Sequence, residues 1–319
     1  MIDDPSSLTI LICTHNRAGL LERTLDSLNG VPRPDGWRVD ILVAANACRD
    51  ETHAYLERYR EQAESRGWLP LTWFAEPTPG KSHALNQAMP RVVADIVAFV
   101  DDDHRVDPGY LRAVAEAAAA HPTVDLFCGR ILPDWDGSEP AWVHDDGPYR
   151  IYPLPVPRYD LGPEARDIHD DGPLPGGGNL FMRAAWLPRV GDFSTEFGPK
   201  GHDLGGAEDL EWVRRALALH ARLRYQPAVV QHHYVDGERL RLFYLIRKAF
   251  ERSASSVRLR HSADKVPLFT YRKAAEYLLR ALFSLSWPRT RFFLVRFAAA
   301  LGEIKGYRQV VLDQSTRRG

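Results

Sequence analysis

The chain has 319 residues, of which 45% are hydrophobic and 26% are charged, and its formal net charge is −1. These values are ordinary for a globular protein, and the length fits one large domain or two smaller ones. Cys13, Cys48 and Cys128 stand too far apart for a disulfide framework or a zinc ribbon, so we expect a reducing, cytoplasmic setting. Neither a signal peptide nor an apolar run of about 18 residues is recognisable, so we expect no membrane-spanning segment.

The charge is unevenly distributed along the chain. From Arg239 onward there are 18 Lys and Arg against 5 Asp and Glu, about +13, which leaves about −14 for the rest. This asymmetry predicts an acidic catalytic body followed by a basic C-terminal region. That region either meets an anionic partner, such as a membrane surface, or packs on the acidic body, and the sequence leaves both open.

The first 130 residues alternate apolar runs with amphipathic segments. Strands are predicted over residues 8–13, 39–45, 71–75 and 95–100, and helices over residues 16–30, 50–66, 82–92 and 108–121. Continuous apolar strands between helices indicate an α/β fold with a mostly parallel, Rossmann-related sheet covered on both faces. The dinucleotide-binding G-x-G-x-x-G fingerprint and the phosphate-binding P-loop are both absent from the sequence.

The regular pattern breaks down between residues 132 and 178, where Pro, Gly, Asp and Trp dominate. A run this long is typical of a functional loop or lid, and Trp135 and Trp142 would suit sugar rings; a plain insertion is the alternative. A helix over residues 208–220 and a strand over residues 223–233 follow, and the remainder is predicted to be helical and basic. We therefore expect a catalytic domain over residues 1–235, divided near residue 131 into a nucleotide half and an acceptor half, and a helical region over residues 236–319.

Polar clusters follow three of the predicted strands: THNR at 14–17, NACRDE at 46–51 and DDDH at 101–104. In open sheets of this kind ligands bind beyond the carboxyl ends of the strands, so the clusters predict one ligand crossing one crevice. The adjacent charges of Asp101, Asp102 and Asp103 repel one another, and a hard divalent cation is the natural partner for them. If the segment is extended, Asp101 and Asp103 point to the same side. The alternative is a capping run before the next helix.

With these pieces in order, the chain resembles glycosyltransferase family 2, which has the GT-A fold. Five segments carry the resemblance between residues 8 and 235: ILICTHNR, NACRDET, GKSHALNQAM, DDDH and GGAEDLEWVRRAL. A single one of them is weak, but five in order are specific. The resemblance implies a nucleotide-diphosphate sugar as donor, with UDP as the expected nucleotide and dTDP and GDP as alternatives, and Mn²⁺ or Mg²⁺ as cofactor.

The resemblance also implies a role for individual residues. Asp103 would bind the metal, Asp101 the ribose with Asp102 between them, Asp209 would be the general base, and Glu208 would position the acceptor. Of His232 and His233, which point to opposite faces of a strand, His232 is the expected second metal ligand. The remaining expected donor contacts are Thr14, Asn16 and Arg17, Asn46 or Asp50 in place of an acid at Ala45, Lys81 on the phosphates, and Gly178 and Asn179 beneath the sugar.

The function that follows is metal-dependent, inverting transfer of a sugar to a hydroxyl of a glycan, lipid-linked or small-molecule acceptor. Inversion is expected because a base opposite the leaving group gives a single displacement. Basic amphipathic segments after Arg239 fit peripheral membrane association or packing on a protein partner. We expect no nucleic-acid partner. Two rivals stay open at this point, namely a metal-dependent nucleotide-sugar hydrolase or pyrophosphatase, and a non-catalytic nucleotide-sugar-binding module.

Overall fold

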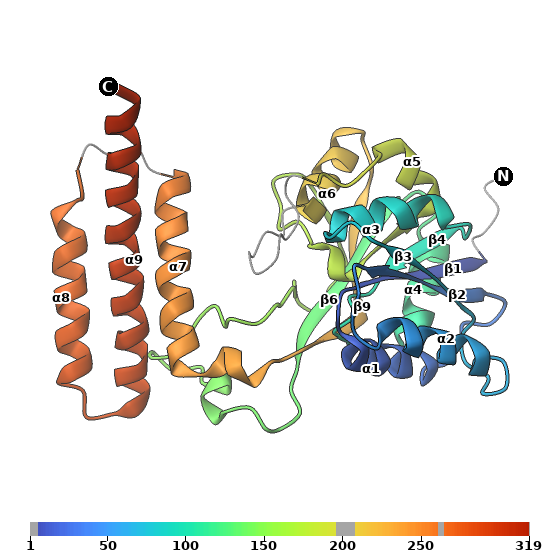
Figure 1. Ribbon diagram of the computed structural model, residues 1–319, viewed down its shortest axis with the longest axis horizontal. Coiled ribbons are helices and arrows are strands. Elements are labelled where there is room, and N and C mark those ends of the chain that lie inside the picture. The colour runs from blue at the N-terminus through green and yellow to red at the C-terminus, as the bar shows by residue number, and fades with distance from the viewer. Residues whose placement is uncertain (1–5, 196–207, 261–264, 319) are drawn as a thin grey trace. The chain divides into compact units, whose positions relative to one another are not determined.

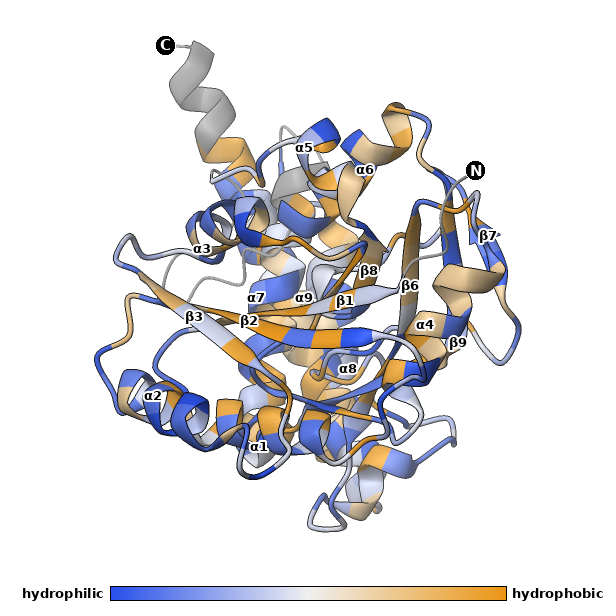
Figure 2. Ribbon diagram, turned by 90° about the vertical axis from the view of Figure 1, so that its right-hand side faces the viewer, coloured by the Kyte–Doolittle hydropathy of each residue, from blue (hydrophilic) through white to orange (hydrophobic). Residues whose placement is uncertain are grey.

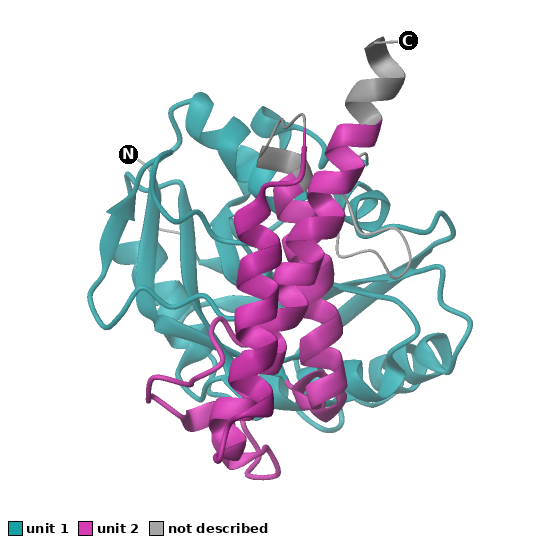
Figure 3. Ribbon diagram, turned by 90° about the vertical axis from the view of Figure 1, so that its left-hand side faces the viewer, with its two compact units in different colours: residues 1–134, 157–234 teal, residues 135–156, 235–319 magenta. Residues whose placement is uncertain are grey.

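The computed structural model describes residues 6–195, 208–260 and 265–318 (Figure 1). It separates into two compact units, drawn in different colours in Figure 3. Unit 1 comprises Met1–Asp134 and Pro157–Tyr234, and unit 2 comprises Trp135–Val156 and Val235–Gly319. The long irregular segment of the sequence is therefore divided between the units, and Trp135–Val156 belongs with the C-terminal helices.

Unit 1 is built on one nine-stranded sheet. The strands are β1 Ser7–Thr14, β2 Arg38–Asn46, β3 Leu71–Glu76, β4 Ile96–Phe99, β5 His104–Val106, β6 Leu126–Asp134, β7 Arg166–Ile168, β8 Leu180–Arg183 and β9 Leu223–Tyr234. Their order is β3-β2-β1-β4-β8-β6-β9-β5, with β7 paired to β9. β1 to β4 form a parallel block, β6 and β9 are also parallel, and β8 runs antiparallel between β4 and β6. The expected mostly parallel sheet is confirmed.

Helices cover both faces of this sheet, as Figure 2 shows by the hydrophobic strands lying between them. They are α1 Ala18–Asn29, α2 Thr52–Gln62, α3 Lys81–Ala88, α4 Tyr110–Ala120, α5 Leu187–Val190 and α6 Glu208–Ala218. Side chains alternate along a strand, so β1 serves two cores: Leu8, Ile10 and Ile12 pack in the cluster that includes residues of α1, α2 and α4, whereas Leu11 packs in the cluster that includes residues of α3, α5 and α6.

Single 3₁₀ turns complete the regular structure. They are η1 Met89–Arg91, η2 Ala141–His144, η3 Gly177–Asn179, η4 Ala184–Trp186 and η5 Gly237–Leu240. Of these, η3 matters most for the site, because it precedes β8 in the middle of the sheet.

Unit 2 consists of three long helices and the segment Trp135–Val156. The helices are α7 Leu242–Arg260, α8 Leu268–Leu282 and α9 Trp287–Arg318, and α9 packs against both others. Gly302 lets α9 approach α7 closely, because a Cβ at this position would lie 2.1 Å from the Phe250 carbonyl oxygen. The irregular segment joins the start of α9 through an ion pair between Asp145 and Arg291 at 3.3 Å. No helix among the described residues is both long and apolar enough to cross a membrane.

Candidate active site

The acidic run lies at the carboxyl ends of β1, β2 and β4, which are neighbours in the parallel block. Asp101, Asp102 and Asp103 form a turn directly after β4, closed by a hydrogen bond from the His104 amide to the Asp101 carbonyl. The segment is therefore a turn and not an extended strand. The expectation that Asp101 and Asp103 point to the same side required an extended segment. Asp102 is buried, with 5% of the residue exposed. The repulsion within this turn has to be balanced by cations, and two side chains supply positive charge.

Arg17 is the first of these cations and comes from the loop between β1 and α1. Its Nη1 lies 2.9 Å from Asp102 Oδ1 and 3.0 Å from Asp103 Oδ2. Burial raises the pKa of Asp102 to about 6, although Arg17 opposes the shift. The predicted role of Arg17 in lining the nucleotide stays a prediction, but its position beside the acidic run is fixed by these two contacts.

Lys81 is the second cation and begins α3. Its Nζ lies 2.9 Å from Asp101 Oδ1 and 3.7 Å from Asp209 Oδ2, so it joins the acidic run to the predicted base. Burial alone would lower the pKa of Lys81, but Asp101 and Asp209 outweigh it and raise this pKa well above its ordinary value. Burial likewise opposes ionisation of Asp101, yet Lys81 and His104 hold the pKa of that carboxyl below its usual range. A charged Lys81 between ionised carboxylates is therefore the stable arrangement.

Asp209 is also held by backbone. The Gly177 amide donates a hydrogen bond of 3.0 Å to Asp209 Oδ2. Only glycine fits here, because a Cβ at Gly177 would lie 2.4 Å from the Asp209 carboxyl carbon. At Gly178 a Cβ would lie 2.7 Å from Asp101 Oδ2 and 2.9 Å from the His104 ring. The turn η3 thus fills the space between the base and the acidic run.

Glu208 precedes Asp209 in the first turn of α6, where the helix dipole favours negative charge. The residue is 2% exposed, and its Oε2 has no hydrogen-bond partner among the described residues. Burial and the neighbouring Asp209 raise the pKa of Glu208. Gly205 and Gly206, which the sequence linked to this motif, lie outside the described residues.

His104, which begins β5, faces the acidic run with one ring nitrogen. Its Nδ1 lies 2.5 Å from Gln231 Oε1, and the Gln231 amide nitrogen donates to the Phe99 carbonyl at 3.0 Å, which fixes the orientation of that amide. Nδ1 must therefore carry the proton. Among the described residues the buried Nε2 has no hydrogen-bond partner, and it lies 3.8 Å from Asp101 Oδ2 and 3.9 Å from Asp103 Oδ1.

His233 shows the same pattern from β9. Its Nδ1 donates to the Tyr234 carbonyl at 2.5 Å, which leaves Nε2 facing Asp103 Oδ2 at 3.6 Å. Burial lowers the pKa of His233, which favours the neutral ring that a metal ligand needs. Ligand atoms of Asp103, His104 and His233 all lie within 4.8 Å of one another. The sequence did not single out His104 as a candidate ligand, although it directly follows the acidic run.

The choice of His232 is corrected by this geometry. In the ladder between β5 and β9, His233 pairs with His104 and His232 pairs with Arg105. Neighbouring residues of a strand point to opposite faces, so His232 turns away, and its Nε2 lies 3.5 Å from Asp107 Oδ2. Alternation along the strand places the two histidines on opposite faces, but the sequence does not show which of these faces is turned towards the carboxylates.

The other side chains that were expected to contact the sugar donor form hydrogen bonds with the loops around the acidic run. The Asn46 amide donates to the Thr78 carbonyl at 2.7 Å and accepts from the Gly80 amide at 2.8 Å. Further hydrogen bonds join Asp50 to the Ala18 amide, Asn16 to the Arg49 amide, and Asn179 to the carbonyls of Arg130 and Val229. Thr14 is buried at the end of β1. These side chains shape the loops of the site, and whether Asn46 or Asp50 also contacts a nucleotide base stays a prediction.

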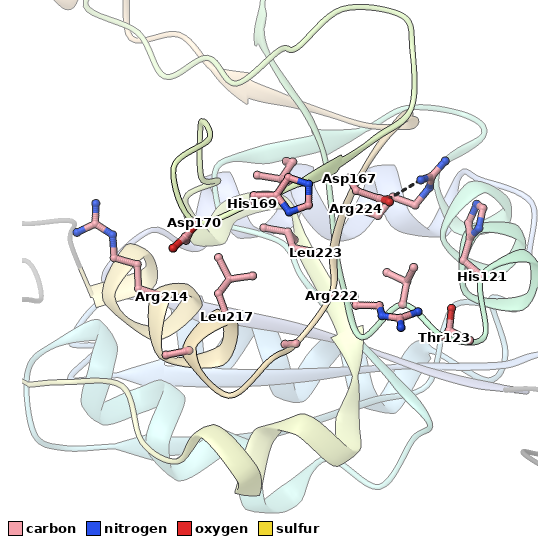
Figure 4. A pocket seen from close by; sticks show the side chains of 14 residues that line it. His121, Thr123, Asp167, His169, Asp170, Arg214, Leu217, Arg222, Leu223 and Arg224 are labelled. Carbon is pink, nitrogen blue, oxygen red and sulfur yellow. Dashed lines mark hydrogen bonds and ion pairs between the residues drawn. The ribbon is translucent and has the colours of Figure 1, made fainter.

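A hollow of about 930 Å³ lies elsewhere in unit 1 (Figure 4). It is bordered by the beginning of β9, the ends of α4 and α6, and β7. β6 and β9 begin there, whereas the acidic run lies at the carboxyl ends of β1, β2 and β4. Of its cationic lining residues, Arg224 is already paired with Asp167 at 2.6 Å. None of the residues of the acidic crevice lines this hollow, so size does not identify the site here.

Comparison with known proteins agrees with the fold and the motifs. The profile of "Glycosyl transferase family 2" matches residues 9–183, more than half of the chain. The succinoglycan biosynthesis protein ExoM of Rhizobium meliloti (strain 1021) is 24% identical over 154 residues, which are 48% of each chain. The chain thus spans about half the length of this curated relative.

Two solved structures share the fold at low sequence identity. The mannosyltransferase PcManGT from Pyrobaculum calidifontis, in complex with GDP-Man and Mn²⁺, is 18% identical with a TM-score of 0.51, covering 100% of this chain and 77% of that one. S. aureus TarS 1-349 in complex with UDP is 17% identical with a TM-score of 0.54, covering 98% and 92%. The chain belongs to glycosyltransferase family 2 and has the GT-A fold.

Proposed function

We propose that this enzyme transfers a sugar from a nucleoside-diphosphate sugar to a hydroxyl acceptor, with a divalent cation and with inversion at the anomeric carbon. The observation that carries the proposal is the position of Lys81, which contacts both Asp101 and Asp209. It brings the acidic run and the only carboxylate bonded to η3 into one crevice among the described residues. That combination suits a reaction in which charge on a leaving diphosphate and a proton on an acceptor must be handled together.

The donor class is supported by the proteins that share the fold. PcManGT was solved with GDP-Man, and TarS with UDP and with UDP-GlcNAc. We therefore infer a nucleoside-diphosphate sugar, with UDP first and dTDP and GDP as alternatives. The sugar could lie against η3, where Gly177 and Gly178 leave no side chain of their own.

The residues present fit a divalent cation. Ring nitrogens of His104 and His233 and the carboxylate of Asp103 converge, and the His104 nitrogen is buried without a hydrogen-bond partner among the described residues. Nitrogen ligands suit Mn²⁺ better than Mg²⁺, so we infer Mn²⁺ as the preferred ion. When bound, such an ion would supply Lewis-acid neutralisation of the diphosphate charge. PcManGT was solved with Mn²⁺.

The chain's own residues divide the remaining work. Asp209 accepts the proton of the acceptor hydroxyl as general base, an effect worth about 10²- to 10⁴-fold in rate. The Gly177 amide and Lys81 hold one of its oxygens, Oδ2, and so orient the other. Glu208 lies beside it with an unpartnered oxygen that can bind a second acceptor hydroxyl. The acceptor oxygen then attacks the anomeric carbon on the face opposite the nucleoside diphosphate, which leaves as its bond to the sugar breaks, so a single displacement inverts the configuration.

The cellular setting that we infer is cytoplasmic. Cys13, Cys48 and Cys128 are all free thiols, and burial raises the pKa of each of them. Protonated thiols are poor nucleophiles and fit a reducing compartment without demanding redox chemistry.

Calorimetric titration of UDP, GDP and dTDP, each with and without Mn²⁺, tests the proposal. We expect one nucleotide to bind the wild type tightly only with Mn²⁺, and the Asp103→Ala variant to lose that binding. Asp107→Ala is the matched control, because Asp107 is close in sequence but contacts His232 on the other face. No binding of any nucleotide would overturn the proposal. Release of free sugar at the same rate with and without acceptors would instead favour the hydrolase.

A further inference from the structure

The turn between α8 and α9 exposes a group of bulky apolar side chains, which we name the apolar turn. Its members and their exposed fractions are Leu279 53%, Leu282 68%, Phe283 79%, Leu285 104% and Trp287 59%. Single exposed apolar residues are common, but five within nine positions at one helical turn form a patch. Exposure of such a patch to water is unfavourable, and a patch of this kind marks a surface that binds an apolar partner.

The charge around the apolar turn has one sign. Residues 277–302 contain four Arg and no Asp or Glu. Arg280 pairs with Glu276 from the preceding turn, and Arg291 pairs with Asp145. Arg289 and Arg296 have aromatic rings as their described neighbours, so their positive charge is not neutralised by a carboxylate. A partner for this end of unit 2 should therefore be apolar in part and anionic in part.

A shallow hollow beside the first turns of α9 offers the anionic contact. It has a volume of about 440 Å³, and Arg150 and Arg296 line it together with Tyr152 and Phe292. Asp146 also lines it and carries the opposing charge, so one excess positive charge remains. Arg150 lies 5.4 Å from the centre of the Tyr152 ring, and Tyr152 is 80% exposed. Two guanidinium groups beside the exposed ring of Tyr152 are a suitable set for a phosphate at an interface.

We propose that this end of unit 2 binds the surface of an anionic phospholipid membrane, with the apolar turn inserted between lipids and Arg150 and Arg296 on their phosphates. Leu and Phe side chains enter the boundary of the acyl chains, and Trp287 suits the interface because its ring is amphipathic. Arginines near anionic headgroups strengthen such binding, which falls with salt. Insertion of a turn needs no spanning helix. The inference does not depend on the donor or on the metal.

Sedimentation of the full-length protein with vesicles tests the proposal. We expect binding to vesicles of equal parts phosphatidylglycerol and phosphatidylcholine, and much weaker binding to phosphatidylcholine alone. The double variant Phe283→Ser/Leu285→Ser should lose at least about tenfold in partitioning, because it removes two apolar side chains that would be buried in the bilayer on insertion. The matched control is Leu268→Ser/Phe269→Ser, which removes one leucine and one phenylalanine that are 83% and 59% exposed at the other end of α8 and should change partitioning less than twofold.

A charge variant separates the phosphate contact from insertion. Arg150→Gln/Arg296→Gln should reduce the preference for phosphatidylglycerol while weak binding to phosphatidylcholine persists. Wild-type tryptophan fluorescence should be quenched by brominated phosphatidylglycerol, and Trp287→Phe should lose most of this quenching, a readout that does not need the serine variants to fold.

Two outcomes would overturn the proposal. Equal loss in the Leu268 control would mean non-specific adsorption. A wild type that ignores vesicles but forms a dimer in light scattering, with Phe283→Ser/Leu285→Ser as a monomer, would assign the apolar turn to a second copy of the chain.

Discussion

The two histidines of the crevice show how a neighbour decides what a side chain can do. His104 and His233 each donate a hydrogen bond from Nδ1 to an acceptor, so both turn Nε2 towards Asp103. The motifs predicted Asp103 from the sequence because an acidic run is unusual after an apolar strand. They could not predict the acceptor of each Nδ1, since Gln231 and His104 are 127 residues apart. Ring tautomers depend on such distant contacts.

The histidine assignment leads to a paired prediction. His233→Ala should weaken Mn²⁺ binding by about tenfold or more, in the range reported for the loss of groups that support a metal site. His232→Ala should leave it within twofold, because this ring faces Asp107 on the other side of β9. Mn²⁺ titration followed by electron paramagnetic resonance measures both. A larger loss of Mn²⁺ binding in His232→Ala than in His233→Ala would restore His232 as the ligand. It would also contradict the inference drawn from the strand register.

Replacement of the predicted base tests its role separately from donor binding. Asp209→Asn keeps the shape of the side chain and can keep an oxygen near the Gly177 amide, but it cannot take a proton. Transfer should fall by about 10²- to 10⁴-fold while the dissociation constant of the donor nucleotide changes less than about threefold. Initial rates and calorimetry on the same preparation give the two numbers. Equal loss of binding and transfer would mean that Asp209 only maintains the crevice.

At the scale of elements, the parallel block and β9 were predictable from the sequence, whereas β5 to β8 were not. The four apolar runs of the first 100 residues became β1 to β4, with ends within one residue or two of the prediction. β5, β7 and β8 have three or four residues each, too few for a period to show in the sequence. β8 nevertheless occupies the centre of the sheet, and η3, which directly precedes it, lies at the site. A strand that positions the site was therefore among the hardest to predict from sequence periodicity.

The position of η3 gives a sharp comparison between adjacent glycines. Gly177→Ala would push a methyl group against the Asp209 carboxylate, whereas Gly176→Ala meets nothing within 4 Å. We expect Gly177→Ala to lose at least about tenfold in kcat, as misplacement of a catalytic group does, and Gly176→Ala to stay near wild type. Thermal unfolding of both variants controls for stability. Equal activity of the two variants would show that Asp209 does not depend on the contact with η3.

The loop after residue 157 is tied to β6 by one carboxylate, and this contact predicts an acid dependence. Asp160 accepts hydrogen bonds from Arg130, Arg158 and the Gly162 amide. Burial opposes ionisation, but these donors, Arg130 first, lower the pKa of Asp160 from 3.8 to about 2. A carboxyl whose pKa is lowered by folding stabilises the protein above its unfolded pKa. That contribution disappears as the pH falls from about 4 to about 2.

Asp160→Asn should accordingly lower the free energy of unfolding by about 1.5–3 kcal/mol at neutral pH, the range for hydrogen bonds to charged groups. The difference from wild type should shrink below pH 4. Asp167→Asn is the control, since Asp167 is 62% exposed and its pair with Arg224 should contribute less than about 1 kcal/mol. Urea unfolding between pH 2 and pH 7 measures both differences. A difference that is constant across this range would rule out the ionised carboxylate as its origin.

At the scale of the whole molecule, the sequence indicated a change of character near residue 235 but not which earlier segment joins the helices. Charge and periodicity are local properties, and they marked the basic helical region correctly. The association of Trp135–Val156 with α9 rests on contacts such as Asp145 with Arg291 and Trp142 beneath the same guanidinium at 4.6 Å. These pairs are almost 150 residues apart, and an irregular run rich in Pro and Gly carries no period from which they could be inferred.

The division into two units predicts that each responds to damage by itself. Gly302→Ala places a methyl group 2.1 Å from the Phe250 carbonyl oxygen and should separate α7 from α9, at a cost of about 1–3 kcal/mol. This cost opposes a gain of about 1 kcal/mol from the better helix propensity of alanine, so the net loss is moderate. Gly147→Ala, in the same unit with nothing within 4 Å, is the matched control.

Hydrogen exchange resolved by peptide measures where that loss appears. We expect amide protection to fall in α7, α8 and α9 of the Gly302→Ala variant, while protection in β1 to β4 equals that of wild type, because the three helices and the sheet belong to separate compact units. Sugar transfer to a small soluble acceptor should persist as well, since the acidic crevice lies entirely in unit 1. If protection in β1 to β4 falls by the same amount, the helices and the catalytic sheet unfold together, and unit 2 is a structural part of the catalytic domain.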